Sequence, residues 1–288
     1  MDTKIIYALD LLSPDLLNAV KSFGDLSEID EIRLRVNRPV SISVAEKDLL
    51  LGTAAKPSDI EHTFKTAFSY SMHSYSKELA NGYITTQGGN RVGICGTAVV
   101  TSGHDNVDTL KYISSVNIRI AREVTGCADE IMKTCFSDGL CGVLVVGAPS
   151  SGKTTVLRDI SRQLGNRYKI SLIDEQGEIS ATHRNIAQND IGALTDVFFG
   201  YPKHTGIATA VRVMSPRAVI ADEIGSDDEA SALEFALHSG VRLVTAVHGA
   251  DLGDAMQKPA IKRLVEQSAF QWAVELSPKR EITVKRID

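Results

Sequence analysis

The stretch Gly147-Ala-Pro-Ser-Ser-Gly-Lys-Thr154 decides the fold, because it matches the pattern G-x-x-x-x-G-K-[ST] at every fixed position. In such a loop, backbone N–H groups point at the oxygens of bound phosphates. Lys153 adds a positive charge for the β- and γ-phosphates, and the hydroxyl of Thr154 adds a ligand for Mg²⁺. We therefore expect the phosphate site to consist of Gly147, Ala148, Pro149, Ser150, Ser151, Gly152, Lys153, Thr154 and Thr155.

The segments on either side of this loop support the motif. The apolar run 142–146, Gly-Val-Leu-Val-Val, is typical of a buried parallel strand. After the loop, the segment 155–164 has apolar residues at helical spacing, namely Val156, Leu157, Ile160 and Leu164. The order strand, glycine loop, helix is the one that the motif requires, and a helix N-terminus favours a bound phosphate.

A second strand is predicted to end in two acids, Ala218-Val-Ile-Ala-Asp-Glu223. Carboxylates at the carboxyl edge of an open α/β sheet lie where ligands bind. We expect Asp222 to join Thr154 in the Mg²⁺ site, usually through water, and Glu223 to act as the general base on an attacking water. Ser226 and Glu229 then form a capping box for the next helix.

Two further strand ends carry polar groups. Ile170-Ser-Leu-Ile-Asp-Glu175 is another apolar strand that ends in two acids, with Glu178 close behind. Either acidic pair would suit the metal, although the order of the motifs favours the later one, and Glu175 and Glu178 are alternative bases. The strand 241–248 ends in His248, which would lie near the γ-phosphate.

Composition excludes several classes of protein. The 288 residues carry a formal charge of −5, which argues against a general nucleic-acid-binding surface. No apolar run approaches the length of a membrane span, and the N-terminal apolar patch is too short and too acidic for a signal peptide. We expect a cytoplasmic protein that reaches a membrane only through a partner. The four cysteines, Cys95, Cys127, Cys135 and Cys141, have none of the spacings typical of metal sites or redox motifs. We expect their side chains to be buried and to pack as apolar groups.

The first half of the chain has a different pattern, typical of an α+β domain. Alternating segments 32–36, 40–44 and 115–121 predict half-buried strands, and Gln87-Gly-Gly-Asn90 predicts a hairpin between 83–85 and 92–95. Helices are predicted from Pro14 to about Phe23, and from the capping box Ser58-Asp-Ile-Glu61 to about Ala80. The prediction is thus an α/β chain with an α+β regulatory or docking domain at 1–130, followed by a P-loop NTPase domain at 131–288.

This order of motifs resembles the secretion ATPases of type II and type IV machines, with their Walker A, Asp box, Walker B and His box. The resemblance is closest to the sporulation members of that group from endospore-forming bacteria. It covers nearly the whole chain, and is carried by the segments 31–39, 82–93, 116–122, 147–159, 215–225 and 245–249. It implies a RecA-like ATPase domain and a homo-oligomer in the form of a hexamer. It also implies that ATP hydrolysis with Mg²⁺ drives assembly or transport at a channel between mother cell and forespore, beside a membrane protein of that channel.

The resemblance also implies that arginines of the N-terminal domain reach the nucleotide of a neighbouring subunit. By motif position these are Arg91 and Arg119. Two positions depart from the family pattern, since Gln176 and Leu194 stand where basic residues are expected. Their loss removes two candidate cations near the phosphates and puts the rate of hydrolysis in doubt.

Three other functions remain open at this stage. A P-loop kinase would need a mobile lid rich in basic residues, which the sequence does not show. A nucleotide-dependent scaffold would bind ATP with little turnover, in keeping with the missing cations. Nucleic-acid binding would rest on a local basic face formed by Arg33, Arg35 and Arg38, and is disfavoured by the acidic net charge.

Overall fold

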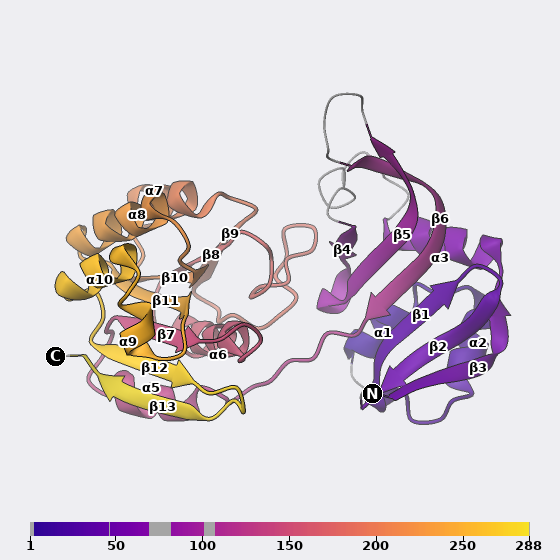
Figure 1. The fold of residues 1–288 in the computed structure, drawn as a ribbon, viewed down its shortest axis with the longest axis horizontal. Coiled ribbons are helices and arrows are strands. Elements are labelled where there is room, and N and C mark those ends of the chain that lie inside the picture. The colour runs from indigo at the N-terminus through magenta and orange to yellow at the C-terminus, as the bar shows by residue number, and fades with distance from the viewer. Residues whose placement is uncertain (1–2, 46, 69–81, 101–106, 288) are drawn as a thin grey trace. The chain divides into compact units, whose positions relative to one another are not determined.

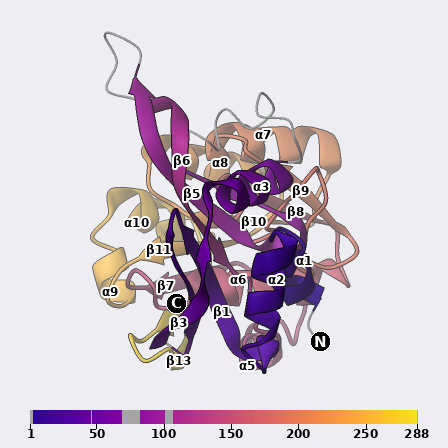
Figure 2. The same cartoon turned by 90° about the vertical axis from the view of Figure 1, so that its right-hand side faces the viewer.

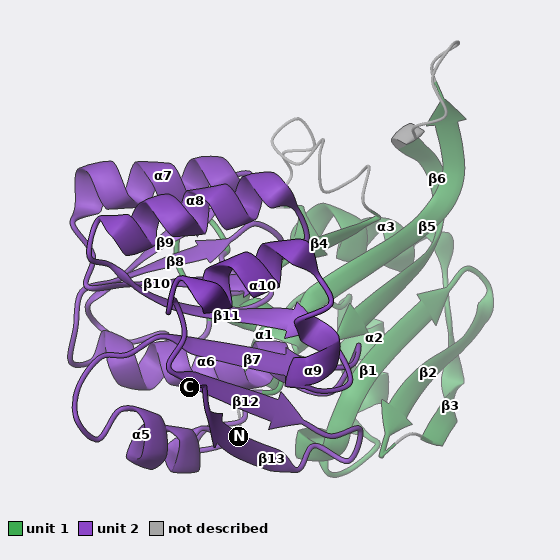
Figure 3. Cartoon of the chain, turned by 60° about the vertical axis from the view of Figure 1, so that its left-hand side comes forward, with its two compact units in different colours: residues 1–122, 183–188 green, residues 123–182, 189–288 purple. Residues whose placement is uncertain are grey.

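A computed structural model describes residues 3–45, 47–68, 82–100 and 107–287. The chain forms two compact units (Figure 3). The first comprises residues 1–122 together with 183–188, and the second comprises 123–182 and 189–288. The division after Arg122 precedes the expected boundary near residue 130, so the helix of the connection, α5 (Asp129–Cys135), belongs to the second unit.

The first unit contains a six-stranded antiparallel sheet in the order β3-β2-β1-β6-β5-β4 (Figure 1). Its strands are β1 (Ile29–Arg35), β2 (Arg38–Val44), β3 (Lys47–Ala55), β4 (Tyr83–Thr85), β5 (Arg91–Val100) and β6 (Val107–Arg119). In Figure 2, β5 and β6 form a long ribbon that extends beyond the other strands. The predicted hairpin is confirmed, since β4 pairs antiparallel with β5.

Alternation along these strands separates a core face from a polar face. On β1, Ile32 and Leu34 are buried whereas Arg33 is only half-buried. The core face packs against helices α1 (Thr3–Leu9), α2 (Pro14–Lys21) and α3 (Pro57–Ala67). Side chains of a strand alternate between the two faces of its sheet, so this pattern directs every second residue of β1, β5 and β6 away from the core.

The segment Gln87–Gly89 is held against α1 by close contacts. Gly88 has a φ of 80°, and a Cβ there would meet the Tyr7 ring at 2.9 Å. The buried side chain of Asn90 donates to the Lys4 carbonyl at 2.8 Å and accepts from the Ala121 backbone at 2.9 Å. The Gly-Gly-Asn part of the motif before Arg91 is therefore explained by packing within this unit.

Residues 183–188 return from the second half of the sequence to the first unit. The His183 ring lies 2.9 Å from the Thr85 carbonyl, and the Gln188 side chain accepts from the Gly88 backbone at 2.8 Å. The sequence did not predict that residues 183–188 belong to the first unit, because hydrogen bonds to backbone atoms far away in the chain leave no periodic pattern of apolar residues.

The second unit contains a seven-stranded sheet in the order β13-β12-β7-β11-β10-β8-β9. Its strands are β7 (Val143–Gly147), β8 (Ile170–Asp174), β9 (Thr195–Phe199), β10 (Ala218–Glu223), β11 (Arg242–His248), β12 (Trp272–Leu276) and β13 (Ile282–Arg286). All neighbours are parallel except β13, which forms the predicted antiparallel hairpin with β12. β7 and β8 are buried at every residue, as expected for strands covered on both faces.

Helices cover both faces of this sheet (Figures 1 and 3). On one face lie α7 (Lys203–Met214), α8 (Asp227–His238) and α10 (Pro259–Glu266), whose buried residues share one core with the strands. On the other face lies α6 (Lys153–Gly165), with α5 beside it. The short helix α9 (Leu252–Ala255) follows β11. Right-handed crossovers between parallel strands require this distribution of helices.

Several local expectations were wrong. The helix expected from Ser58 begins instead at Pro57, because proline suits the first helical position, and Asp59 accepts from the Lys56 backbone at 2.8 Å. It ends at Ala67, and the rest of the expected helix lies largely outside the described residues. The sequence patterns also missed the strands β3 and β9 and the helices α1, α7, α9 and α10. Cys95 is exposed rather than buried, whereas burial raises the pKa of Cys135 to about 12.

Candidate functional site

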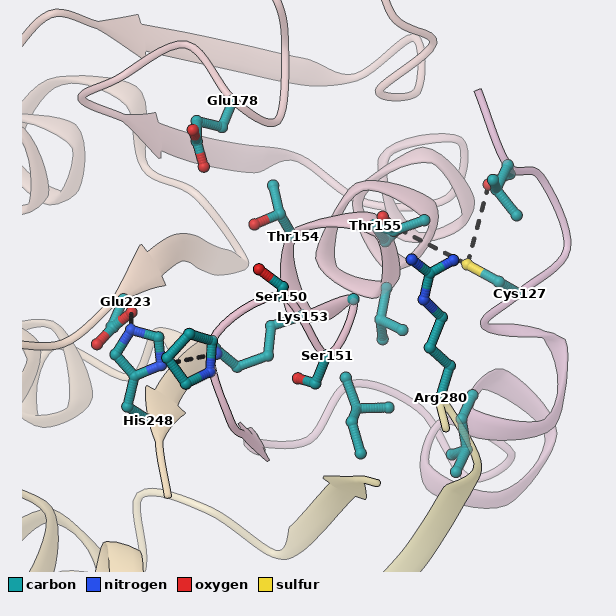
Figure 4. Close-up of a pocket in the computed structure, with 16 residues that line it drawn as sticks. Cys127, Ser150, Ser151, Lys153, Thr154, Thr155, Glu178, Glu223, His248 and Arg280 are labelled. Carbon is teal, nitrogen blue, oxygen red and sulfur yellow. Dashed lines mark hydrogen bonds and ion pairs between the residues drawn. The ribbon is translucent and has the colours of Figure 1, made fainter. Parts of the chain in front are cut away.

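The four strands that carry motifs lie side by side in the sheet, in the order β7, β11, β10, β8. Because they are parallel, their carboxyl ends meet at one edge. A pocket of about 540 Å³ lies there, lined by the phosphate loop, Glu178, Glu223, His248, and residues of the linker and the C-terminal hairpin (Figure 4). Its volume is within the range of small-molecule sites.

The phosphate loop contains two left-handed backbone positions, one at a glycine and one at a serine. Gly152 has a φ of 101° and Ser150 a φ of 63°. A Cβ at Gly147 would collide with the Ser151 hydroxyl at 2.4 Å and crowd Leu276 at 3.2 Å, so any side chain here would force these neighbours to shift. α6 starts at Lys153 directly after the loop, which points its N-terminus at the pocket.

A chain of three side chains crosses the pocket. The Lys153 ammonium donates to the carbonyls of Gly147 and Ala148 at 2.8 and 2.9 Å, and lies 2.8 Å from His248 Nδ1. His248 Nε2 lies 2.6 Å from Glu223 Oε2. An ammonium can only donate, so Nδ1 of His248 accepts, and its Nε2 carries the proton that reaches Glu223. Burial lowers the pKa of Lys153.

At the end of β8, Asp174 is fully buried and does not face the pocket. Its carboxylate accepts from the backbones of Glu178, Ile179 and Ser180 at 2.9, 3.3 and 2.7 Å, and from the Ser180 hydroxyl at 2.6 Å. These bonds curl the turn so that Glu178 lines the pocket opposite Thr154 (Figure 4). Glu175 is not among the residues that line it.

At the end of β10, Asp222 and Glu223 point in different directions. The pairing with β11 shifts register between Ala221 and Glu223, which indicates a β-bulge at Asp222. Bulges of this kind re-aim side chains and are common beside active sites. Glu223 lines the pocket, whereas the Asp222 carboxylate lies 2.9 Å from the ammonium of Lys203 on α7 and does not line it.

The oxygen donors that face the pocket suit Mg²⁺ held jointly with a nucleotide. They are the Thr154 hydroxyl and the carboxylates of Glu178 and Glu223. Mg²⁺ keeps several waters and uses substrate phosphates as ligands, so it does not require a cage of protein ligands. Accordingly, the described residues contain no cluster of three or more His, Cys, Asp or Glu that would hold a metal alone. The Asp222 carboxylate pairs with Lys203 and does not line the pocket, and its role as a Mg²⁺ ligand through water stays a prediction.

Burial raises the pKa of Asp222 to about 6, opposed by the nearby Lys203 and reinforced by Asp174 and Glu175. Burial alone would lower the pKa of Lys203, but the facing carboxylates of Asp222, Glu229 and Glu175 raise it above its ordinary value. The two groups therefore form a mutually dependent ion pair. Sequence analysis missed Lys203 because no known spacing connects it with Asp222.

A second region of the pocket is apolar and was also missed. Val124, Cys127, Leu276 and Ile282 line it together with Arg280, from the turn between β12 and β13. Figure 4 shows the Arg280 side chain reaching toward Thr155, on the side of the loop away from Glu223. An aliphatic surface beside a guanidinium suits the planar base of a nucleotide, which it can stack against.

Arg91 and Arg119 face each other on adjacent strands of the first unit. The Arg91 guanidinium lies over the Tyr83 ring, 5.3 Å from its centroid, and Arg119 is exposed. Both lie on the polar face of the sheet, as the alternation with buried Val92 and Ile118 requires. Their predicted action on a neighbouring subunit's nucleotide stays a prediction.

The two departures from the family pattern lie in different places. Gln176 is exposed in the turn after β8, at the carboxyl edge. Leu194 immediately precedes β9, so it lies at the amino edge of the parallel sheet, opposite the pocket of its own chain. A basic residue at position 194 would therefore not approach the phosphates bound by the same chain.

Comparison with known proteins agrees with these motifs. A family model described as Sporulation stage III, protein AA, matches residues 7–286. The chain belongs to this family. It is 36% identical over 276 residues to the stage III sporulation protein AA of Bacillus subtilis (strain 168), covering 93% of this chain and 89% of that protein.

Two solved structures share the fold of this chain. The Legionella pneumophila ATPase DotB is 14% identical and has a TM-score of 0.58, covering 95% of this chain and 80% of that one. The pilus retraction motor PilT, solved with bound ADP, is 13% identical with a TM-score of 0.59, covering 91% and 76%. The predicted fold, a RecA-like P-loop domain after a smaller α+β domain, is confirmed. In the described part of the chain, no helix has the length and apolar character to cross a membrane.

Proposed function

We propose that this chain binds ATP with Mg²⁺ and hydrolyses it. The observation that carries the proposal is the convergence of the phosphate loop, Glu178, Glu223 and His248 on one pocket. A kinase would need an acceptor pocket and a basic lid, neither of which the sequence motifs indicate. The metal, bound at Thr154 and the substrate phosphates, would neutralise the charge that develops during phosphoryl transfer.

The side chains of the pocket then have separate tasks. Lys153 exchanges the carbonyls of Gly147 and Ala148, which it contacts now, for the β- and γ-phosphates of ATP. That exchange also takes the ammonium away from His248, whose ring remains beside Glu223. Glu223 accepts a proton from the attacking water, and Glu178 orients that water from the opposite side of the pocket.

Substitution of the phosphate-loop lysine tests the site. Lys153→Ala removes the only flexible cation of the motif and should reduce binding of a fluorescent ATP analogue below detection while the protein stays folded. Lys262→Ala, an exposed lysine on α10 of the same unit, is the matched control and should bind as the wild type does. Unchanged affinity in Lys153→Ala would disprove the assignment.

We further propose that the active form is a hexameric ring, in which Arg91 and Arg119 of one subunit act on the ATP of the next. Support comes from the family resemblance and from the position of both arginines on one polar face. Cations supplied in trans stabilise charged transition states in many phosphoryl-transfer enzymes.

If the active site is shared between subunits, specific activity should rise with protein concentration. Mixing Arg119→Ala with Lys153→Ala chains should restore part of the activity, and a failure of both tests would show that each chain is complete alone.

Family membership supports a role for this ATPase in sporulation. We propose that it works on the cytoplasmic side of a membrane, bound to a membrane protein of the channel between mother cell and forespore, and drives assembly or transport there. A spore-forming host carrying Glu223→Gln should then complete fewer spores, although the protein accumulates normally. A scaffold that needs ATP binding but not turnover would leave sporulation intact in that strain.

A further inference from the structure

Lys203 lies close to two carboxylates, those of Asp222 and Glu229, at the carboxyl end of β10. Its ammonium is 2.9 Å from Asp222 Oδ1 and 3.5 Å from Glu229 Oε1, and the side chain is only 14% exposed. The same ammonium donates a short hydrogen bond to the main-chain carbonyl of Glu223. Lys203 is also the first residue of α7, where a positive charge faces the positive end of the helix dipole. A buried ammonium in this unfavourable position needs nearby carboxylates and carbonyl groups to stabilise its charge.

These contacts hold the chain segment that carries Glu223 from one side. Glu229 accepts from the backbones of Gly225 and Ser226 at 2.6 and 3.1 Å, so the Lys203–Glu229 pair also secures the loop after β10. From the other side, the Thr245 hydroxyl of β11 donates to the Asp222 carbonyl at 2.7 Å. The bulge at Asp222 is thus anchored by a side chain from each flank.

The bulge has a consequence for the two acids. One carboxylate of the Asp-Glu pair must face the pocket and the other must be accommodated in the interior, where an unpaired charge is costly. Lys203 supplies the counter-charge for Asp222, and its bond to the Glu223 carbonyl sets the backbone from which the Glu223 side chain reaches His248. Without Lys203, Asp222 would lose its counter-charge and Glu223 would lose its backbone anchor.

We propose that Lys203 is a positioning residue for hydrolysis, which acts through the main chain of Glu223 and the carboxylate of Asp222 so that Glu223 alone of the two acids faces the nucleotide. This inference rests on the proposed ATP hydrolysis. It assigns to α7 a direct part in the active site, although Lys203 itself does not line the pocket.

The test separates turnover from binding in Lys203→Met, which keeps much of the side-chain volume but has no charge. We expect kcat to fall by about tenfold or more, since small displacements of catalytic groups have effects of that size. Affinity for a fluorescent ATP analogue should stay within about threefold of wild type, because the phosphate loop is untouched. Lys169→Met, at an exposed position of the same unit, is the matched control and should change neither quantity.

Two more variants exclude a merely structural explanation. Lys203→Met with Asp222→Asn removes the unpaired charge, so thermal stability should recover, but kcat should stay low because the Glu223 carbonyl still lacks its donor. Asp222→Asn alone leaves that donor in place, so its kcat should fall less than that of Lys203→Met. Lys203→Arg retains a donor and should recover part of the rate.

Each alternative outcome is informative. Wild-type kcat in folded Lys203→Met, recovery of kcat in the double variant, or loss of affinity in proportion to kcat would overturn the role of Lys203 and leave the proposed hydrolysis standing. A wild-type protein that binds ATP without turning it over would instead contradict the proposed function, and the positioning role would fall with it.

Discussion

An Asp-Glu pair lies at the carboxyl end of both β8 and β10, yet the two pairs have different surroundings. At β8, Asp174 is fully buried and accepts hydrogen bonds from its own turn, and the pocket receives Glu178 rather than Glu175. At β10, Asp222 pairs with Lys203 and the pocket receives the very next residue, Glu223.

This difference shows that the same pair of residues can shape a turn or present a base. The two outcomes differ because the groups that pair with the aspartate come from different parts of the chain. Backbone N–H groups of residues 178–180 satisfy Asp174 locally, so the chain must curl around it. Asp222 has its counter-charge from a lysine on a separate helix, so the strand needs only a bulge to direct Glu223 into the pocket.

The largest expected effect is on turnover at the β10 end. Glu223→Gln keeps the shape of the side chain but removes the base, so the rate should fall by roughly 10² to 10⁴ while binding of ATP with Mg²⁺ is kept. Phosphate release and analogue titration measure the two quantities. Glu175→Gln is the control from the other strand end, since Glu175 does not line the pocket. A larger loss in Glu178→Gln than in Glu223→Gln would exchange their roles.

The next effect is on stability at the β8 end. Asp174→Ala leaves the backbones of residues 178–180 and the Ser180 hydroxyl without their acceptor. The free energy of unfolding should fall by about 3 kcal/mol, the upper range for buried groups left unsatisfied. Urea unfolding measures this. Asp222→Asn, which retains the main-chain bonds at β10, should be clearly less destabilising, and equal losses would remove the distinction between the two ends.

A smaller effect is expected on the apolar side of the pocket, away from both acidic ends. Arg280→Ala should weaken ATP binding by about tenfold, the effect of losing one cation–π or ionic contact of 1–2 kcal/mol. Binding of inorganic triphosphate should change less if Arg280 contacts the base, and equally if it contacts the phosphates. Lys279→Ala, from the neighbouring exposed position of the same turn, serves as the control.

The smallest effect concerns the amino edge of the sheet. Leu194→Arg restores a residue type of the family pattern, but position 194 lies across the sheet from the pocket of its own chain. The rate of dilute protein should therefore be unchanged. A gain that develops only at high concentration would place Leu194 beside the nucleotide of a neighbouring subunit.

The motifs of the second unit were predictable because their chemistry is local. The phosphate loop, the acidic strand ends and the capping box of Ser226 and Glu229 each occupy one short stretch of sequence, and parallel strands necessarily bring their carboxyl ends to one edge. The alternating strands of the first unit were predictable for the same reason. By contrast, α1 was missed because it has only seven residues and depends on tertiary packing for its stability, and β3 was missed because most of its residues are exposed and give no alternating pattern.

The sequence by itself determined the fold class, the phosphate-binding loop and the set of acids available to it. Only the tertiary structure decided which acid faces the pocket. Asp222 pairs with Lys203 and does not line the pocket, and Glu178 enters the pocket where Glu175 does not. The reason is physical: a buried carboxylate must find a donor or a cation, and which partner reaches it depends on helices and turns far away in the sequence.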